Sequence, residues 1–238
     1  MKKQKYKRSR KKSSKSEESF PLSFILGIVF LVFVVYKILP SYLFITRPTP
    51  NSISLTDPDT SISPVQINLT PEEFDENIID DILIDGKIIK IKPVAKYEIS
   101  ARVVSKRNYT EKWDGKLMPV DLALVWGDLA KEEHHQFMTY RHSDRYFSWN
   151  STGKAKLNKK YIISHSANVH FISANKNIEN ALLTTDIDEN VKIIGYLVDI
   201  TGPGGDSKRT SLSREDNGSG ACENVYIQKL KIGKEVFQ

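Results

Sequence analysis

The stretch YEISARV, residues 97–103, decides the fold class, because apolar and polar residues alternate in it at every position. A period of two is typical of a β-strand with one buried face and one solvated face. The segment KIIKIK, residues 87–92, alternates in the same way and places Ile89 and Ile91 on one side. The two segments predict two strands that are consecutive in the chain.

The chain beyond these strands continues as short apolar segments separated by turn residues. Residues 191–200 are apolar on both faces, which suits a central strand, and Gly195 marks a bend or bulge in it. Further strands are expected at 122–126, 137–140, 146–149, 168–173, 209–213 and 224–232, and short helices at 128–136 and 175–183. This pattern predicts a mainly β domain, or an α+β one, built as a small rolled sheet or an OB-like barrel with one to three short helices.

A long apolar segment precedes the domain. Residues 20–39 read FPLSFILGIVFLVFVVYKIL, and no charged residue occurs from Phe20 to Tyr36. About twenty helical residues span the roughly 30 Å hydrocarbon core of a bilayer. A signal peptide has a shorter apolar core, of about 7–15 residues, and a small-x-small cleavage site, which this stretch lacks. We therefore predict a retained single transmembrane helix within residues 20–45.

The charges around that helix set its expected orientation. Nine Lys and Arg residues lie within residues 1–16, and only Lys37 and Arg47 lie near the other end. Positively charged flanking residues stay on the cytoplasmic side of a membrane. Residues 1–19 are therefore expected to form a basic tail on the cytoplasmic side of the cytoplasmic (inner) membrane. Residues 46–69 hold four prolines and are expected to be a linker. Residues 70–238 are then an extracytoplasmic domain.

The net charge of +6 belongs to the tail. Of the 35 Lys and Arg residues, nine lie in residues 1–16 and one is Lys37, which leaves 25 from Arg47 onward against 27 Asp and Glu. A body without excess positive charge offers no basic surface to phosphates, so nucleic acid is not an expected partner. The expected partners are the lipid bilayer and an envelope protein or another extracytoplasmic ligand. The single Cys222 excludes an internal disulfide.

Three further stretches carry a resemblance. They are PVDLALVWGDLA at 119–130, HSANVHFISA at 165–174 and SLSREDNGSGACENVYI at 211–227. Together they resemble an uncharacterised family of bacterial membrane-anchored proteins. The resemblance covers residues 97–230 and implies a bacterial source and one coherent domain, and it brings no catalytic residue with it.

Cys222 allows two main interpretations, and the sequence leaves both open. As a nucleophile, its thiolate would pair with His165 or His170, and backbone N–H groups of residues 218–220 would form an oxyanion hole. As a structural residue, it would open the last strand and pack, since free Cys is among the most buried residue types. An intermolecular disulfide is the remaining alternative.

Binding residues are expected in the polar run before Cys222 and among the aromatic residues. Arg214, Glu215 and Asp216 place both charge signs beside a glycine turn, as the rim of a polar pocket would, and either acid could orient the catalytic histidine. Asp121 and Trp126 are further binding candidates. Aromatic faces could stack a sugar or peptide, although core packing is their more common use. The aromatic residues concentrated here are Trp113, Trp126, Tyr140, Tyr146, Phe147 and Trp149.

No metal site and no cofactor are expected. Residues 132–135 lack a ligand spacing such as HExxH, and His165 and His170 point to opposite faces if the chain between them is extended. The glycine-rich run 202–205 is followed by Asp206 instead of the Lys-Ser/Thr pair of a P-loop, which favours a plain turn.

Two classes of function remain. The first is a non-enzymatic, membrane-anchored extracytoplasmic module that binds or supports an envelope component. The alternative is a Cys-dependent hydrolase or transferase acting outside the cytoplasmic membrane. A sulfur exposed in a cleft within reach of a histidine favours the enzyme, and a sulfur buried among apolar neighbours favours the module.

The membrane topology gives a first testable prediction. A phosphatase that is active only outside the cytoplasm should be active when fused to the C-terminus, because the basic tail keeps the N-terminus inside. A green fluorescent protein fused at the same position is the reciprocal control and should be dark. Fluorescence without phosphatase activity contradicts the predicted orientation.

Overall fold

The longest strand, β3 (Lys87–Asn108), organises the domain. It joins the two expected strands into one, and its buried residues alternate with partly exposed ones over most of its length. Pro93 lies between the two halves, and the pairing of β3 with β8 (Asn190–Thr201) shifts register between Pro93 and Ala95. Proline has no N–H to donate, so a strand accepts it where the pairing is irregular.

The computed structural model describes residues 46–76, 79–216, 218 and 220–238. The predicted basic tail and transmembrane helix, residues 1–45, lie outside these described residues. Within the described ranges no helix is long and apolar enough to cross a membrane. The described chain is mainly β with a few short helices, which confirms the predicted class.

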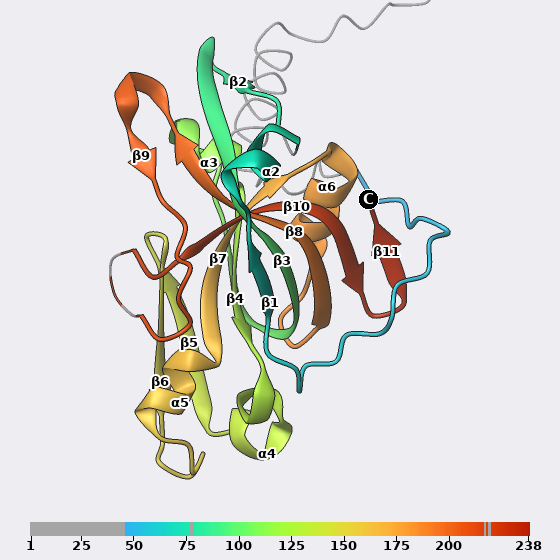
Figure 1. Cartoon of the computed structure of the whole chain (residues 1–238). Coiled ribbons are helices and arrows are strands. Elements are labelled where there is room, and N and C mark those ends of the chain that lie inside the picture. The colour runs from blue at the N-terminus through green and yellow to red at the C-terminus, as the bar shows by residue number, and fades with distance from the viewer. Residues whose placement is uncertain (1–45, 77–78, 217, 219) are drawn as a thin grey trace, which may run out of the picture. The chain divides into compact units, whose positions relative to one another are not determined.

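The main sheet closes on itself (Figure 1). Strand β3 pairs with β4 (Val120–Val125), β4 with β7 (Ser166–Ser173), β7 with β10 (Glu223–Ile232), β10 with β8, and β8 again with β3. The β7–β10 pairing is parallel and the others are antiparallel. The helix α6 (Lys176–Thr184) connects β7 to β8. A rolled sheet was predicted, and this connectivity is consistent with it.

The inner face of the closed sheet forms the main core. Val120, Leu122 and Leu124 of β4 face inward, and so do Val169 and Phe171 of β7. The inward residues of α6 are Ile178, Ala181 and Leu182, and they belong to the same cluster. The intervening residues of β4, β7 and β10 therefore point to the outer face, because side chains alternate along a strand.

A separate hairpin packs on part of that outer face. Strands β5 (Met138–Ser143) and β6 (Tyr146–Ser151) are joined by Asp144 and Arg145, whose φ angles are 44° and 66°. Two positive φ angles define the type I′ turn that suits a two-residue hairpin. A second cluster forms between the hairpin, α5 (Lys159–Ser164) and the outer face, and it contains Ala123, Val125, Met138 and Ile162.

Smaller elements complete the domain. Strand β1 (Val65–Asn68) and β2 (Ile82–Ile84) pair with β3, β9 (Ser207–Lys208) with β8, and β11 (Glu235–Phe237) with β10. The short helices are α2 (Pro71–Glu76), α3 (Lys112–Leu117), α4 (Glu132–His135), and the 3₁₀ turns η2 (Gly127–Ala130) and η3 (Pro203–Gly205).

Most of the locally predicted elements are present, and one is absent. The hairpin, the 191–200 strand and the 175–183 helix are confirmed. The predicted helix at 128–136 is divided into η2 and α4, with Lys131 extended between them. The predicted strand at 209–213 is wrong: these residues form no strand, and the N–H groups of Thr210 and Ser211 bond instead to Asp199 Oδ1 and the Cys222 carbonyl.

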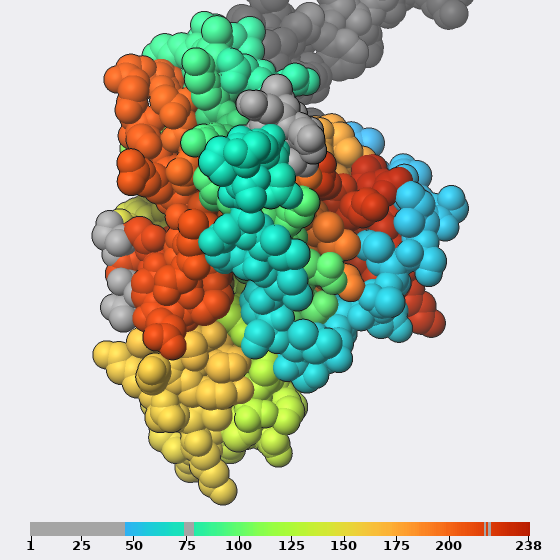
Figure 2. All heavy atoms as spheres, viewed as in Figure 1, coloured from blue at the N-terminus to red at the C-terminus, as the bar shows by residue number. Residues whose placement is uncertain are grey.

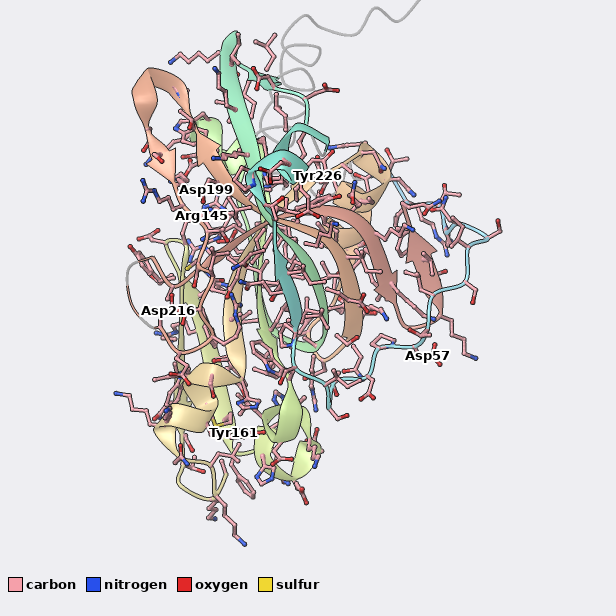
Figure 3. The ribbon with its side chains drawn as sticks, viewed as in Figure 1. Asp57, Arg145, Tyr161, Asp199, Asp216 and Tyr226 are labelled. Atoms are coloured by element: carbon pink, nitrogen blue, oxygen red, sulfur yellow. The ribbon has the colours of Figure 1, made fainter. Side chains whose placement is uncertain are left out.

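The predicted linker lies against the domain along much of its length (Figure 1, blue to cyan). The N–H of Asn51 donates to the Val236 carbonyl at 2.6 Å. Asp57 pairs with Lys231 at 2.8 Å, and Figure 3 labels Asp57 on this segment. The last residues of the expected linker form β1. Residues Ile45–Gln238 therefore make one compact unit.

Gly195 provides the stability prediction for this fold. A Cβ there would lie 2.0 Å from the Tyr226 carbonyl oxygen, next to the register shift between Ile227 and Lys229. Gly195→Ala should lower the unfolding free energy of the 46–238 fragment by about 3 kcal/mol or more, since backbone on a paired strand must move. Urea denaturation measures it.

The control is Gly86→Ala, a turn glycine at φ 73° with open space around its Cβ. Only the cost of a positive φ applies there, about 1 kcal/mol. Equal losses in the two variants would contradict the steric argument.

Candidate functional site

The site lies on the outer face of three adjacent strands. Asp121 of β4 is directly opposite His170 of β7, which is directly opposite Asn224 of β10. Cys222 immediately precedes β10 and contacts Asn168 of β7, one row away. Directly paired and diagonal side chains on one face of a sheet are within reach of each other. Cross-strand pairing therefore assembles residues that are up to about a hundred positions apart in the sequence.

The carboxylate of Asp121 is the fixed point of this cluster. The residue is fully buried, and Nδ1 of His170 lies 2.9 Å from its Oδ1. The guanidinium of Arg145 donates to the same oxygen at 2.7 Å. A buried carboxylate is stable only when it is paired, and Arg145 and His170 together provide that pairing.

Arg145 is itself held on several sides. Its guanidinium donates to the carbonyls of Met118 and Asp114, each at 2.9 Å. It lies over the Tyr109 side chain, 3.8 Å from the centre of the aromatic group. The type I′ turn of the hairpin thus places the Arg145 guanidinium against the outer face of the closed sheet.

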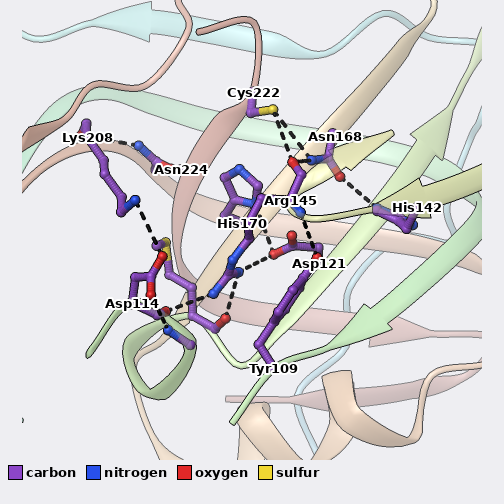
Figure 4. Close-up of polar contacts among 12 residues, drawn as sticks. Tyr109, Asp114, Asp121, His142, Arg145, Asn168, His170, Lys208, Cys222 and Asn224 are labelled. Carbon is purple, nitrogen blue, oxygen red and sulfur yellow. Dashed lines mark hydrogen bonds and ion pairs between the residues drawn. The ribbon is translucent and has the colours of Figure 1, made fainter. Parts of the chain in front are cut away.

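Cys222 sits beside this pair. It is partly exposed, Nδ2 of Asn168 lies 3.4 Å from its sulfur, and the sulfur is 3.8 Å from the Arg145 carbonyl. Figure 4 shows the His170 imidazole between Cys222 and Asp121. Because Nδ1 of His170 faces Asp121, Nε2 is the nitrogen left for the sulfur.

A chain of hydrogen bonds fixes the orientation of Asn168. Its Oδ1 is 2.8 Å from Nε2 of His142, and Nδ1 of His142 is 2.8 Å from the Ser105 hydroxyl. Its amide nitrogen donates to the Arg145 carbonyl at 2.7 Å. Burial lowers the pKa of His142, so the side chain is neutral and Nε2–H donates to Asn168. The amide N–H groups must then face Arg145 and Cys222.

The electrostatics of His170 follow from its neighbours. Burial lowers the pKa of His170, but the contacts with the Asp121 carboxylate and the Cys222 sulfur outweigh burial and raise the pKa to about 9. The imidazole is therefore protonated at neutral pH. A carboxylate on one side and a sulfur on the other hold this cation.

Cys222 lines a cavity of about 290 Å³. Residues 146–149 of β6 form one wall, Ile163 and residues 166–168 form the second, and Asp216, Gly218, Ala221 and Cys222 form the third. In Figure 2 the segment that precedes β10 (orange to red) lies against the α5 region (yellow) on the face shown. Figure 3 shows Asp216, a residue of the third wall, on the same side of the domain as Arg145 and Tyr161.

A buried ion pair anchors that third wall. Arg214 pairs with Glu223, which is almost fully buried on the inner face of the sheet. Burial raises the pKa of Glu223 to about 7, although Arg214 opposes this shift. Arg214 also lies over Tyr97, 5.8 Å from the centre of its aromatic group. The pair joins the segment before Cys222 to the strand that follows it.

Only some of the candidate residues lie together at the site. It brings Cys222, His170 and Asp121 together, and Asp216 lines the cavity. His165 stacks on Tyr161, 3.8 Å between centres, and is not beside Cys222. Glu215 is exposed, and its carboxylate lies 3.9 Å from Lys160.

Two expectations need correction. The histidine is oriented by Asp121, which was expected to bind a ligand, and not by Glu215 or Asp216. Trp126 is 1% exposed in the main core, so it cannot stack a ligand. Of the expected oxyanion residues, Gly218 lines the cavity, and Ser219 lies outside the described residues. Three of the six aromatic residues, Tyr146, Phe147 and Trp149, line the cavity.

Asn168, His142 and Arg145 also belong to the site, although the sequence alone did not predict them. One signal for Asn168 was available in the sequence. It lies two residues before His170 in HSANVH, and residues two apart on a strand lie on the same face. Three stretches of the sequence meet at this site: residues 119–130 supply Asp121, residues 165–174 supply Asn168 and His170, and residues 211–227 supply Cys222.

Metal binding has no geometric support in the part of the chain that the structure describes, where no three His, Cys, Asp or Glu side chains are grouped to hold an ion. Comparisons with protein-family models, with curated proteins and with solved structures found no match to the chain.

The raised pKa of His170 predicts how stability depends on pH. The contribution of this residue is complete below its unfolded pKa of about 6.5 and is lost as pH rises through about 9. The unfolding free energy of the 46–238 fragment should therefore fall by up to about 3 kcal/mol between these pH values.

His170→Asn should remove most of that decrease. His135→Asn is the control, because burial lowers the pKa of His135 and moves its titration out of this window. Urea denaturation at pH 6 and pH 9 gives the comparison. The same decrease in wild type and His170→Asn would contradict the assignment.

Proposed function

We propose that this protein is a Cys-dependent acyl hydrolase or transferase, with Cys222 as the nucleophile, His170 as the acid and base, and Asp121 as the residue that orients His170. One observation carries the proposal: the partly exposed Cys222 lines a cavity and lies beside a histidine that a buried carboxylate holds. A thiol is activated when a base lies beside it and a third group on the far side of the base orients that base.

The proposed reaction has two steps. The Cys222 thiolate attacks a carbonyl carbon and forms a carbon–sulfur bond, and protonated His170 gives its proton to the leaving group as the original bond breaks. Water or another nucleophile then attacks the thioester and loses its proton to His170, and the sulfur leaves as thiolate. The Asn168 amide, 3.4 Å from the sulfur, is a donor for the developing oxyanion.

We also propose that this chemistry occurs outside the cytoplasmic membrane of a bacterium. The uncharged segment from Phe20 to Tyr36 and the nine basic residues before it support an anchored protein with its domain outside. The near-neutral charge from Arg47 onward supports a substrate in the envelope and not a nucleic acid.

The finer fold is proposed to be an OB-like barrel. The five-strand closure, the single parallel pairing and the helix between β7 and β8 support it. Such barrels bind ligands on their second and third strands and on the loop between their fourth and fifth. The corresponding elements are β4, β7 and the 202–222 connection, which carry the site. This correspondence favours a second candidate function, a binding module whose ligand occupies the same cavity without covalent chemistry.

Alkylation of the single cysteine tests the nucleophile. Cys222 should react with iodoacetamide at pH 6 at least about tenfold faster in wild type than in His170→Ala, because an adjacent cation favours the reactive thiolate. His165→Ala, which changes a histidine away from the sulfur, should leave the rate unchanged. Mass spectrometry of the quenched protein measures the rates.

The same protein then tests covalent catalysis. Incubation with p-nitrophenyl acetate should place one acetyl group on Cys222, sensitive to hydroxylamine as a thioester is. Equal, slow alkylation in wild type and His170→Ala, without an acetyl adduct, would favour the binding module.

A further inference from the structure

Strand β6 has an open edge at the cavity. Among the described residues, β6 pairs with β5 and with no other strand. Residues 146–149 of β6 line the same cavity as Cys222. An unpaired edge presents a row of N–H and C=O groups that can pair with another extended chain.

The hairpin register identifies which groups are free. Ser143 and Tyr146 close the two-residue turn, so they form a hydrogen-bonded pair. The bond from the Thr152 N–H to the Phe137 carbonyl, 3.1 Å, continues the same alternation at the far end of the hairpin. The backbone groups of Phe147 and Trp149 must therefore point away from β5, toward the open edge.

The cavity also selects by side chain and charge. Tyr146, Phe147 and Trp149 give it an aromatic wall, and Asp216 is the only charged residue among the described residues that line it. The carboxylate of Asp216 accepts a bond from the Ser211 hydroxyl at 2.7 Å. An acidic side chain entering the cavity meets this carboxylate and no lining cation, whereas an apolar or aromatic side chain meets the β6 wall.

We infer that the substrate is an extended polypeptide that adds as a strand to the open edge of β6, with an apolar or aromatic side chain in the cavity and its carbonyl carbon at Cys222. Main-chain hydrogen bonds to Phe147 and Trp149 supply affinity, and the cavity supplies specificity, as in other cases of strand addition. This inference rests on the proposed function, because it needs a nucleophilic Cys222.

Three tripeptide vinyl sulfones test the inference on the full chain in detergent. The first carries Phe next to the electrophile, the second is the same peptide with its backbone nitrogens methylated, and the third carries Glu instead of Phe. Mass spectrometry gives each rate of labelling at Cys222. The Phe probe should react at least about tenfold faster than either other probe, since methylation removes the strand hydrogen bonds and Glu meets Asp216.

Variants of the aromatic wall add a second readout. Trp149→Ala should lower the ratio of the Phe-probe rate to the iodoacetamide rate by about tenfold, because the small reagent does not need the aromatic wall. Leu83→Ala, an exposed apolar residue of β2 away from the cavity, is the control and should change neither rate.

Each outcome has one meaning. Slow reaction with iodoacetamide and with all three peptides overturns the proposed function itself. Fast iodoacetamide reaction with equal rates for the Phe and methylated probes overturns strand addition while the nucleophile stands. Equal rates for the Phe and Glu probes overturn the specificity assigned to the cavity.

Discussion

The buried carboxylate of Asp121 is the constraint on which the site depends. A charge without solvent costs several kcal/mol unless it is paired, so the closed sheet can hold Asp121 only if cations reach it. Arg145 comes from the hairpin and His170 from the neighbouring strand. The contacts of Asp121 Oδ1 therefore hold the hairpin against the sheet through Arg145, and they orient the His170 imidazole and keep it protonated.

The hairpin turn and the segment before Cys222 contribute to one cavity through different interactions. The Arg145 carbonyl accepts from Asn168, so the same residue that pairs with Asp121 also positions the amide beside the sulfur. On the other side, Arg214 and Glu223 bind the loop to the inner face of the sheet. Movement of either segment would change the surroundings of Cys222, and both are held by charges that are largely withdrawn from solvent.

Local periodicity was enough to predict the strands but not the residues that meet on them. The alternation in 97–103 and the apolar run in 191–200 identify buried faces directly, and the bend at Gly195 is a local signal as well. Pairing between Asp121 and His170 depends on the register of β4 against β7, which no local pattern encodes. Residues 209–213 were misassigned because the N–H groups of Thr210 and Ser211 bond to Asp199 Oδ1 and the Cys222 carbonyl and not to a neighbouring strand.

The chain enters and leaves the described domain at one place. Asn51 accepts a hydrogen bond from the N–H of the last residue, Gln238, at 2.9 Å, and Thr49 bonds to Asn177 on α6. A domain whose ends adjoin can be inserted into a loop of another protein without separating the flanking host segments. This unit is therefore suited to insertion, as a single piece, into a loop of another protein. The face that carries the candidate site, on β4, β7 and β10, is built from residues that lie between Thr49 and Gln238.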